Sequence, residues 1–241
     1  MCTVTFFKKS SNDFVLTSNR DEAPFRLSSA PQIYSLNNTN ALFPKDEVAG
    51  GTWIGTSDKN RTLCVLNGGF EAHERKADYR LSRGIIVREL LIANDLFQSL
   101  ETFDLNDVEP FTLIIVLHEE QLQLFQLVWD GNKKHLSELP LKPRLWSSSS
   151  LYTKSMKTER EQWFKNFIQK NPGRADSILD FHKTTGSGNL DYGIIMDRHF
   201  VKTTSITQIE KERDSIMMNY TNLNDGTHTL QELKLKKHIE R

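Results

Sequence analysis

Residues 1–22, MCTVTFFKKSSNDFVLTSNRDE, decide the fold that we expect of this chain. Two apolar stretches within them, one around Phe6 and one around Leu16, flank the polar link KKSSND. Apolar stretches on either side of a short polar link are typical of a β-hairpin. The chain is therefore expected to begin with two antiparallel strands whose turn is centred between Ser10 and Ser11.

The register of this hairpin determines which polar groups lie near the chain terminus. A turn at this point pairs Asn19 with Cys2, and the residues that follow, Arg20, Asp21 and Glu22, then lie just beyond the strand end. There Arg20 would favour a thiolate and could hold a substrate carboxylate or carbonyl, while Asp21 could orient an amine. The alternative is a polar hairpin end with a solvated ion pair. The spacing favours neither, because a slip of one residue changes the face that Arg20 occupies.

The second residue, Cys2, carries the chemistry of greatest interest. A small residue at this position permits removal of Met1, which leaves a thiol and a free α-amine on one residue. The reference pKa of the amine is about 7.7–8.0 and that of the thiol is about 8.5, so the amine can accept the thiol proton near neutral pH. Cysteine also occurs second in a chain by chance, so Cys2 alone does not identify a nucleophile.

The rest of the chain indicates an α+β protein. Further strands are expected at 51–56, 62–67, 111–117, 121–129, 145–148, 205–210, 215–221 and 228–235. Helices are expected over 83–100, where Ser82 caps the first turn, over 157–169, and around 178–181. Strands at both ends with helices between them suit a layered α+β arrangement more than a βαβ alternation. No repeat or linker stands out, so we expect one domain over residues 1–241.

Composition and charge argue against several classes of protein. Lys and Arg number 31 and Asp and Glu number 31, whereas nucleic-acid-binding proteins usually carry a basic excess. No apolar run approaches the ~20 residues of a membrane helix, so no integral membrane segment is expected. No export signal is visible, and the only cysteines are Cys2 and Cys64, which favours a reducing cytoplasm. We expect a cytoplasmic protein whose partner is a small-molecule substrate or ligand, with no nucleic acid.

Other chemistry-bearing residues give weaker signals. The seven histidines show no pair at i and i+4 and no cysteine at ligand spacing, so neither a metal nor a cofactor is expected. Cys64, within TLCVL, is most simply a buried strand residue. Trp53, within GGTWIG, is expected in the core, with a lesser chance of lining a pocket. The charged run 71–80 fits a solvated loop better than the rim of a cleft.

Three short motifs together resemble a known family. They are SNRDE at 18–22 after an N-terminal MC, GGTWIG at 50–55 and LNGG at 66–69. The combination resembles the NRDE family, also called the transport and Golgi organisation protein 2 family, strongly over residues 1–80 and less beyond. Members of that family are similar to N-terminal nucleophile hydrolases of the penicillin V acylase and bile salt hydrolase group. The resemblance implies a four-layer αββα sandwich whose N-terminal nucleophile opens into a cleft between strands.

The resemblance also implies roles for individual residues. Cys2 would be the nucleophile and its own α-amine the base, with Arg20 and Asp21 lining the nucleophile. Asn67, at the end of TLCVLN, would help the Cys2 amide to form an oxyanion hole, a contact worth on the order of 3 kcal/mol. Without the resemblance, Asn67-Gly68 would be interpreted as an ordinary hairpin turn. The substrate-binding residues expected beside these are Asn19, Glu22, Trp53 and Ser148.

Two positions depart from the family pattern. Where related acylases have a second Asn after a middle strand, this chain has WSSSS, so Ser147 or Ser148 offers only a hydroxyl. Where relatives have a Gly-Thr-Arg-Ser/Thr run, this chain has VKTTSIT, so Thr203 takes the place of the Arg. The neighbouring Lys202 does not replace it, because successive strand residues point to opposite faces. A hydrolase without these two groups would be slow, altered in substrate, or no longer an enzyme.

These observations lead to three functional hypotheses. The first is an N-terminal cysteine amidohydrolase that cleaves a non-peptide C–N amide bond after removal of Met1. The second, favoured modestly by the two departures, is a non-catalytic intracellular carrier or chaperone of haem or a lipid-like ligand that uses the same cleft. The third is an interaction protein in which Cys2 has no role in binding a ligand. No heptad or self-complementary strand edge indicates an oligomeric state.

Overall fold

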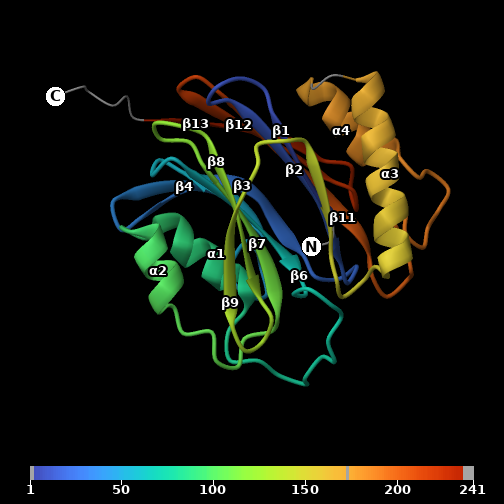
Figure 1. Ribbon diagram of the computed structural model, residues 1–241, viewed down its shortest axis with the longest axis horizontal. Coiled ribbons are helices and arrows are strands. Elements are labelled where there is room, and N and C mark those ends of the chain that lie inside the picture. The colour runs from blue at the N-terminus through green and yellow to red at the C-terminus, as the bar shows by residue number, and fades with distance from the viewer. Residues whose placement is uncertain (1–2, 172–173, 236–241) are drawn as a thin grey trace.

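The computed structural model describes residues 3–171 and 174–235, so Cys2 lies outside the described residues. Within these ranges the chain forms two antiparallel sheets and four helices (Figure 1). The protein is therefore of the α+β class, as the sequence predicts.

One sheet unites the beginning and the end of the chain. Its six strands lie in the order β10-β1-β2-β11-β12-β13, and β2 pairs with β11 along most of its length. The strands are β1 (Thr3–Lys8), β2 (Phe14–Glu22), β10 (Arg144–Ser147), β11 (Lys202–Glu212), β12 (Ser215–Asn222) and β13 (His228–Lys234). The predicted C-terminal strands are thus confirmed.

The other sheet is a meander of seven strands in chain order. They are β3 (Ser28–Leu36), β4 (Thr39–Asp46), β5 (Ile54–Ser57), β6 (Arg61–Asn67), β7 (Phe111–Leu117), β8 (Gln123–Trp129) and β9 (Lys134–Leu139). The sequence did not predict β3, β4 or β9. The edge strands β3 and β9 have mostly half-exposed or exposed side chains, and the apolar part of β4 is short, so none of them shows the alternation of a half-buried strand.

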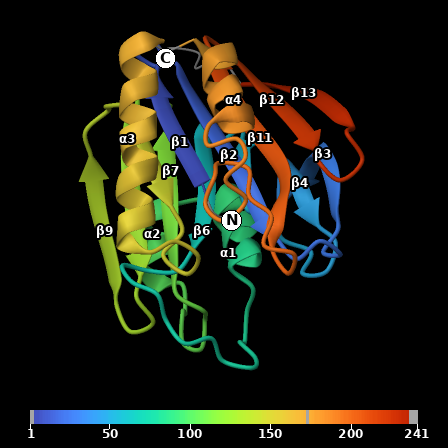
Figure 2. The same ribbon diagram turned by 90° about the vertical axis from the view of Figure 1, so that its right-hand side faces the viewer.

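Helices cover the outer face of each sheet (Figures 1 and 2). On the seven-stranded sheet, α1 (Arg83–Ile92) packs on β4, β5 and β6 and contacts α2 (Leu96–Thr102). On the six-stranded sheet, α3 (Lys154–Lys170) packs on β10, and α4 (Ala175–Thr184) packs on β2 and β11. No helix in the described ranges is long and apolar enough to cross a membrane.

The alternation of β1 and β2 divides their side chains between two apolar clusters. Val4, Phe6, Phe14 and Leu16 are fully buried in the cluster that lies between the two sheets. Val15 faces the other way, into a smaller cluster beneath α3 and α4. Burial of each such side chain contributes about 1.5–3 kcal/mol. Apolar packing therefore fixes both faces of β1 and β2. This packing also fixes the positions of the polar residues at the ends of these strands.

The N-terminal hairpin forms, but its register differs by one residue from the predicted one. Thr3, and not Cys2, is paired with Asn19. The turn is centred on Ser11, and not between Ser10 and Ser11, since Lys8 pairs with Phe14 and the backbone N–H of Lys9 donates to the carbonyl oxygen of Asp13 at 2.8 Å. A shift of one residue moves every paired side chain to the other face, so the predicted pairing of Asn19 with Cys2 was wrong.

The polar residues that follow Asn19 belong to the strand. The sequence places Arg20, Asp21 and Glu22 beyond the strand end, whereas β2 runs to Glu22 and pairs there with Lys202 of β11. Because side chains alternate along a strand, Arg20 and Asp21 point to opposite faces of the sheet. Arg20 therefore points between the two sheets, and Asp21 points toward the helices.

The helix predicted over 83–100 is two helices. Ser82 begins α1, as predicted, because its hydroxyl accepts a backbone hydrogen bond from the first turn. A second cap follows at Asp95, whose carboxylate accepts the backbone N–H of Gln98 at 3.0 Å and begins α2. Aspartate favours the N-cap position because its side chain competes with the helical backbone for hydrogen bonds. The apolar periodicity continues from α1 into α2 and therefore did not reveal this break.

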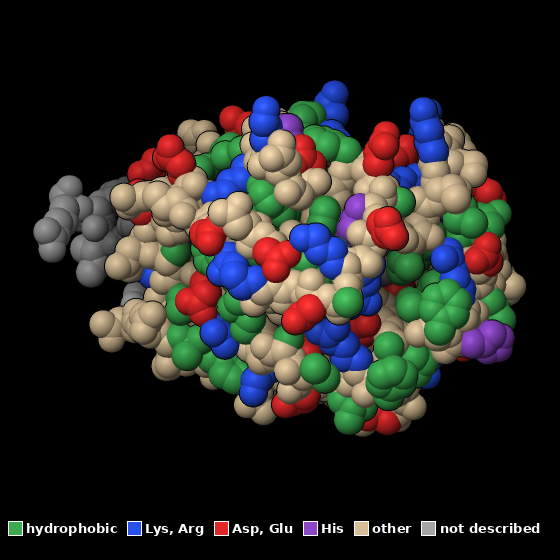
Figure 3. All heavy atoms as spheres, turned by 90° about the horizontal axis from the view of Figure 1, so that it is seen from below, with side chains coloured by type: hydrophobic (Ala, Val, Ile, Leu, Met, Phe, Trp, Pro, Cys, Tyr) green, Lys and Arg blue, Asp and Glu red, His purple; other side chains and the backbone are tan. Residues whose placement is uncertain are grey.

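Charges of both signs share the molecular surface. The face shown in Figure 3 carries Lys and Arg side chains interspersed with Asp and Glu. Charges of opposite sign therefore alternate over this face. This face presents no basic stripe of the kind that binds a phosphate backbone.

Candidate functional site

The candidate site lies at the end of the two sheets where β1 begins. Thr3, the first residue of β1, is paired with Asn19 of β2 on one side and with Ser147 of β10 on the other. Cys2, which the sequence predicts to be the nucleophile, precedes Thr3 and lies outside the described residues. If Cys2 is the nucleophile, the side chains that surround it come from the ends of β2, β6 and β10.

Arg20 is a buried guanidinium held from several sides. Its Nη2 is 2.7 Å from Oδ2 of Asp46, and its Nη1 donates to the carbonyl oxygen of Arg26 at 2.9 Å. A longer bond of 3.3 Å joins Nη1 to the hydroxyl of Thr204. The guanidinium also lies 4.7 Å from the ring centre of Trp53. These contacts fix both the position and the orientation of the charge.

Two carboxylates near Arg20 are stabilised in their ionised form. Burial by itself raises the pKa of Asp46, but the N–H of Ala49 and the charges of Arg26 and Arg20 bring it below its ordinary value. Burial likewise raises the pKa of Glu22, and surrounding positive charges, among them Arg26 and Arg20, lower it below its ordinary value. The basic groups here are therefore matched by carboxylates that are charged at neutral pH.

Asp21 faces the helices on the other side of the sheet. The hydroxyl of Tyr152 donates to its Oδ2 at 2.9 Å, and the hydroxyl of Thr203 donates to its Oδ1 at 2.6 Å. The Thr203 hydroxyl also accepts the backbone N–H of Met196 at 3.0 Å. At position 203, where the family resemblance implies an Arg, the chain therefore has a hydroxyl that is already engaged by Asp21.

Asn19, which the sequence analysis predicts to bind substrate, makes hydrogen bonds within the protein. Its side-chain nitrogen donates to the carbonyl oxygens of Ile194 at 2.8 Å and of His182 at 3.2 Å. Its side-chain oxygen lies 2.6 Å from Nδ1 of His182, whose Nε2 bonds the hydroxyl of Thr5 at 2.7 Å. Asn19 is fully buried, and both ends of its amide hold α4 against the sheet.

Asn67 lies at the end of β6 and leads into the loop over 68–82, so the alternative interpretation of Asn67-Gly68 as a hairpin turn was wrong. The hydroxyl of Ser148 donates to the backbone oxygen of Asn67 at 2.7 Å and lies 2.9 Å from the hydroxyl of Ser150. The side-chain amide of Asn67 makes no hydrogen bond to any described residue.

Two hollows meet at Asn67. The inner one has a volume of about 60 Å³ and the outer one of about 240 Å³. The predicted site residues that line the inner hollow are Arg20, Glu22, Trp53 and Asn67. Those that line the outer hollow are Asn67 and Ser148. Asn19 and Asp21 line neither, in keeping with their orientation toward the helices.

Arg160 of α3 is a buried cation that the sequence interpretation missed. Its Nε donates to the hydroxyl of Ser147 at 3.0 Å, and its Nη2 donates to the hydroxyl of Thr3. The residue is fully buried although it stands in the charged run KTERE. Its spacing of four and seven residues from Phe164 and Phe167 places it on the apolar face of the helix, and this was the available signal.

Lys157, one turn before Arg160, extends toward the outer hollow. Its Nζ donates to the hydroxyl of Ser149 at 3.2 Å. Burial lowers the pKa of its ammonium group, against a smaller raising effect of Glu161. The outer hollow therefore has a partly buried amine at its wall, which the sequence analysis did not single out.

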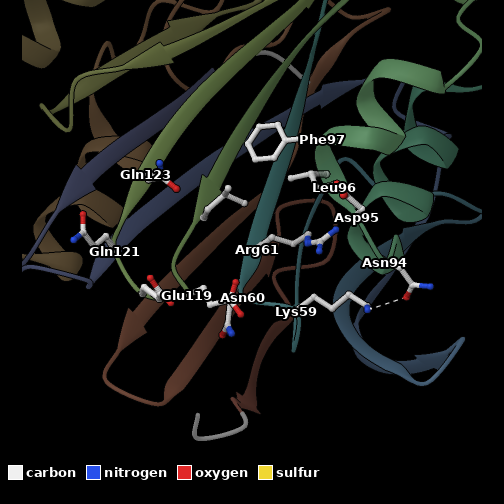
Figure 4. A pocket seen from close by; sticks show the side chains of 12 residues that line it. Lys59, Asn60, Arg61, Asn94, Asp95, Leu96, Phe97, Glu119, Gln121 and Gln123 are labelled. Atoms are coloured by element: carbon white, nitrogen blue, oxygen red, sulfur yellow. Dashed lines mark hydrogen bonds between the residues drawn. The ribbon is translucent and has the colours of Figure 1, made fainter. Parts of the chain in front are cut away.

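A larger hollow includes Arg61 at the other end of β6 from Asn67 (Figure 4). It has a volume of about 580 Å³ and lies between the β5–β6 turn and the connection of α1 to α2. Arg61 donates from Nη1 to the carbonyl oxygens of Leu90 and Ala93 at 3.1 and 3.0 Å. Lys59 donates to the side-chain oxygen of Asn94 at 3.1 Å. These cations close the end of α1, so their contacts are structural.

Several solved structures share this fold. The N-acylethanolamine-hydrolyzing acid amidase ortholog of Caenorhabditis elegans has a TM-score of 0.58 at 10% identity, over 86% of this chain and 92% of that chain. A variant of the conjugated bile acid hydrolase of Clostridium perfringens has a TM-score of 0.54 at 10% identity, over 99% and 100%. Penicillin V acylase of Agrobacterium tumefaciens has a TM-score of 0.51 at 11% identity, over 99% and 94%. These enzymes are of the N-terminal nucleophile hydrolase type, and at such low identity the likeness concerns the fold alone.

The sequence also matches the model of a protein family, although no curated protein sequence matches it. The family model described as Transport and Golgi organisation 2 covers residues 1–237. This range includes the three motifs at 18–22, 50–55 and 66–69, and it extends far beyond residue 80, where the resemblance read from the sequence weakens. The chain therefore belongs to the Transport and Golgi organisation 2 family.

Proposed function

We propose that this chain is an N-terminal cysteine amidohydrolase that cleaves the C–N bond of a small-molecule, non-peptide amide. The observation that supports this most is the side-chain amide of Asn67, which has no described partner and faces the hollow beside Arg20. Ser147, which lines the outer hollow, is paired with Thr3, the residue to which Cys2 is covalently joined. Solved structures of similar fold include enzymes named as an acid amidase, a bile acid hydrolase and a penicillin acylase.

In this proposal removal of Met1 exposes the α-amine of Cys2, which accepts the proton of the thiol. The thiolate attacks the carbonyl carbon of the amide, and the side-chain N–H of Asn67 donates to the oxyanion that develops. The C–N bond then breaks, and the leaving amine takes the proton held by the α-amine. A water molecule attacks the thioester, gives its proton to the α-amine, and releases the acid and the free thiol.

The charged groups around the inner hollow suit this chemistry. Arg20 is held by Asp46 and the backbone, so its charge is in place before a substrate arrives, which is how preorganised sites lower a barrier. Glu22 and Trp53 line the same hollow and would contact the substrate, and Ser148 lines the outer one. We further propose that the two sheets with helices outside them form the four-layer αββα arrangement, and that the protein acts in the cytoplasm.

The test is hydrolysis of fluorogenic amides in which aminocoumarin is joined to acyl groups of increasing length. Cys2→Ala is expected to lower kcat/KM by at least ~10³-fold for any acyl group that the wild type cleaves. The matched control is Cys64→Ala, since Cys64 is fully buried in β6 away from the hollows. Equal rates for wild type and Cys2→Ala would contradict the proposal.

A carrier function remains the second candidate, because the two departures from the family pattern are occupied by internal hydrogen bonds. Ser148 donates to the backbone of Asn67, and Thr203 donates to Asp21, so neither hydroxyl is free for a reacting group. For haem the described lining offers little, since no His, Met, Tyr or Cys lines either hollow. Both hollows are also smaller than the ~300–1,000 Å³ of usual ligand pockets.

Titration of the purified protein with haem and with a fatty acid separates the two candidates. Stoichiometric uptake of either, with no hydrolysis of any amide by the wild type, would favour the carrier. Uptake of neither, together with hydrolysis that depends on Cys2, is the result that the amidohydrolase proposal predicts.

A further inference from the structure

The arginines that line the inner hollow are all paired with carboxylates. Nη2 of Arg20 and Nε of Arg26 lie 2.7 and 2.9 Å from Oδ2 of Asp46. Nη2 of Arg83 lies 2.9 Å from Oε2 of Glu109. The positive charges of the inner hollow are therefore compensated within the protein, and an anionic ligand would have to compete with these carboxylates.

The outer hollow differs, because its two cations have no such partner. Lys157 of α3 and Arg144 of β10 line it, and neither forms an ion pair with a carboxylate among the described residues. Of the described residues that line this hollow, Glu161 is the one carboxylate, so the lining carries a net positive charge. An anion that enters the outer hollow therefore meets uncompensated positive charge.

Burial makes the charge of Lys157 costly. It lowers the pKa of the ammonium group, and the opposite effect of Glu161 is smaller. The hydrogen bond from Nζ of Lys157 to the hydroxyl of Ser149, at 3.2 Å, uses one of the three protons of the ammonium group. An anion in the outer hollow would offset the cost of burial and accept the other donors.

Lys134 of β9 is also half-buried, and its ammonium group is used differently. Burial lowers its pKa too, but Nζ of Lys134 donates to the carbonyl oxygens of Leu100, Glu101 and Phe103 at 2.8, 2.7 and 2.7 Å. These three bonds use all three protons to close the end of α2. Lys134 therefore has no donor left for a ligand, whereas Lys157 has.

Two serine hydroxyls beside Lys157 have already spent their protons on the backbone. Ser148 donates to the carbonyl oxygen of Asn67, and Ser149 donates to that of Gly69. The outer hollow therefore offers an anion its charged groups more than a ring of hydroxyl donors. Such a lining suits the two oxygens of a carboxylate better than the three oxygens of a phosphate group.

We propose that the outer hollow binds a carboxylate on the acyl part of the substrate, with Lys157 as its ionic partner and Arg144 as a second cation of the lining. This assignment rests on the amidohydrolase function proposed above, and it makes the substrates monoamides of dicarboxylic acids. The acyl part stays in the site through both steps of that reaction, whereas the amine leaves after the first, so the anchored group is assigned to the acyl part. The side-chain amide of Asn67 lines the same hollow and is left to the reacting carbonyl oxygen.

Two fluorogenic substrates that differ only in this group test the assignment. They are glutaryl-aminocoumarin and its counterpart in which a primary carboxamide replaces the carboxylate. The ratio of kcat/KM for the acid to kcat/KM for the carboxamide should exceed one in the wild type. It should fall at least ~10-fold in Lys157→Met, because a hydrogen bond to a charged group is lost.

Two further variants separate a local contact from a change in overall charge. Lys157→Arg keeps the positive charge and should keep most of the ratio. Lys165→Met removes the same charge from an exposed position on α3 and should leave the ratio as in the wild type.

NMR measures binding without turnover, on protein whose lysines carry carbon-13 methyl groups from reductive methylation. The resonance of Lys157 is the one that is absent from Lys157→Arg. Glutarate should shift this resonance, and inorganic phosphate at the same concentration should shift it less.

Equal ratios in the wild type and Lys157→Met would overturn the proposal. So would a Lys157 resonance that glutarate leaves in place, or that phosphate shifts as far. Failure of the amidohydrolase function gives a different pattern: no amide is hydrolysed, while glutarate still shifts the resonance of Lys157 and the carboxylate site stands.

Discussion

The two ends of β6 differ in what the polar side chains around them do. At the far end, where β6 begins, the hollow of about 580 Å³ is the larger, and Nη1 of Arg61 and Nζ of Lys59 donate to the end of α1 and the connection that follows, while Nε of Arg61 is buried without a described partner. At the end where β1 begins the hollows are about 60 and 240 Å³, yet the amide of Asn67 has no described partner and Arg20 is fixed beside it.

This difference teaches that the volume of a hollow does not identify the functional end of this molecule. A donor that already closes a helix end must give up that bond to hold a ligand, which costs about 1–3 kcal/mol when the carbonyl stays buried. An amide that has no partner among the described residues and lies next to a fixed guanidinium requires no exchange of such a bond. The predictions below test whether the two ends differ in this way.

The largest expected effect is on stability, at the end where β1 begins. Arg20→Gln removes one partner of a buried ion pair and leaves Asp46 with Arg26, so the free energy of unfolding should fall by about 3–5 kcal/mol. Arg61→Gln at the far end loses only hydrogen bonds to backbone carbonyls, and about 1–3 kcal/mol is expected. Urea denaturation measures both. A larger loss of unfolding free energy in Arg61→Gln than in Arg20→Gln would contradict this prediction.

The next effect is on activity. Asn67→Ala should lower kcat/KM for the best amide substrate by ~10²–10³-fold, because it removes the donor proposed for the oxyanion. Asn94→Ala, at the wall of the far hollow, removes an amide that only bonds Lys59 and should leave kcat/KM unchanged. Steady-state kinetics on the two variants decide the matter. If Asn94→Ala is inactive and Asn67→Ala is active, the catalytic site lies at the far hollow and our assignment of the site is wrong.

Acid should weaken both ends through one buried histidine each. Burial and the charge of Arg160 lower the pKa of His182 to about 3, and burial and the charges of Lys211 and Arg61 lower that of His118 to about 3. Below pH ~6.5 the unfolded chain binds a proton at each histidine and the folded chain does not. Each histidine should therefore reduce the free energy of unfolding by about 1.4 kcal/mol per pH unit as the pH falls from ~6.5 toward 3.

Variants at the two histidines sharpen this prediction. Nδ1 of His118 is buried without a described partner, whereas both ring nitrogens of His182 are hydrogen-bonded. His118→Leu should keep most of the stability at pH 7 and lose part of the acid sensitivity, while His182→Leu should be less stable even at pH 7. Denaturant curves at several pH values measure both. An unchanged pH slope in His118→Leu would rule out its contribution.

The smallest effect concerns a helix cap. Asp95→Ala removes the cap of α2 at the far hollow and should lower the free energy of unfolding by about 1 kcal/mol. Because this end has a structural role in our account, kcat/KM should not change. A thermal melt combined with the amide assay tests this prediction, and a drop in kcat/KM that exceeds the loss of folded protein would contradict it.

Much of the fold could be predicted from local patterns. The strand β7 is found at the predicted residues 111–117, since its apolar run is continuous, and Ser82 caps α1 as predicted. The hairpin at the N-terminus was recognised, but the pattern does not fix the centre of its turn, and the register differs by one residue. The break at Asp95 was missed because the apolar periodicity continues from α1 into α2.

The candidate site could be predicted only in part. Arg20, Glu22, Trp53 and Asn67 were selected from short motifs and line one hollow, whereas Asn19 faces the helices because the register differs by one. Arg160 was missed because its partners come from β1, β10 and the segment before β11, and such long-range contacts leave no local pattern. Its spacing from the aromatic residues of α3 was the local signal.

The most direct test of the central claim is the intact mass of protein purified from its native cell, before and after brief reaction with an activated acyl ester. The account predicts a mass that lacks Met1 and then gains one acyl group, located on Cys2 and absent from Cys2→Ala. A mass that retains Met1, or a processed chain whose Cys2 stays unmodified while the ester is in excess, would contradict the claim that Cys2 is an N-terminal nucleophile.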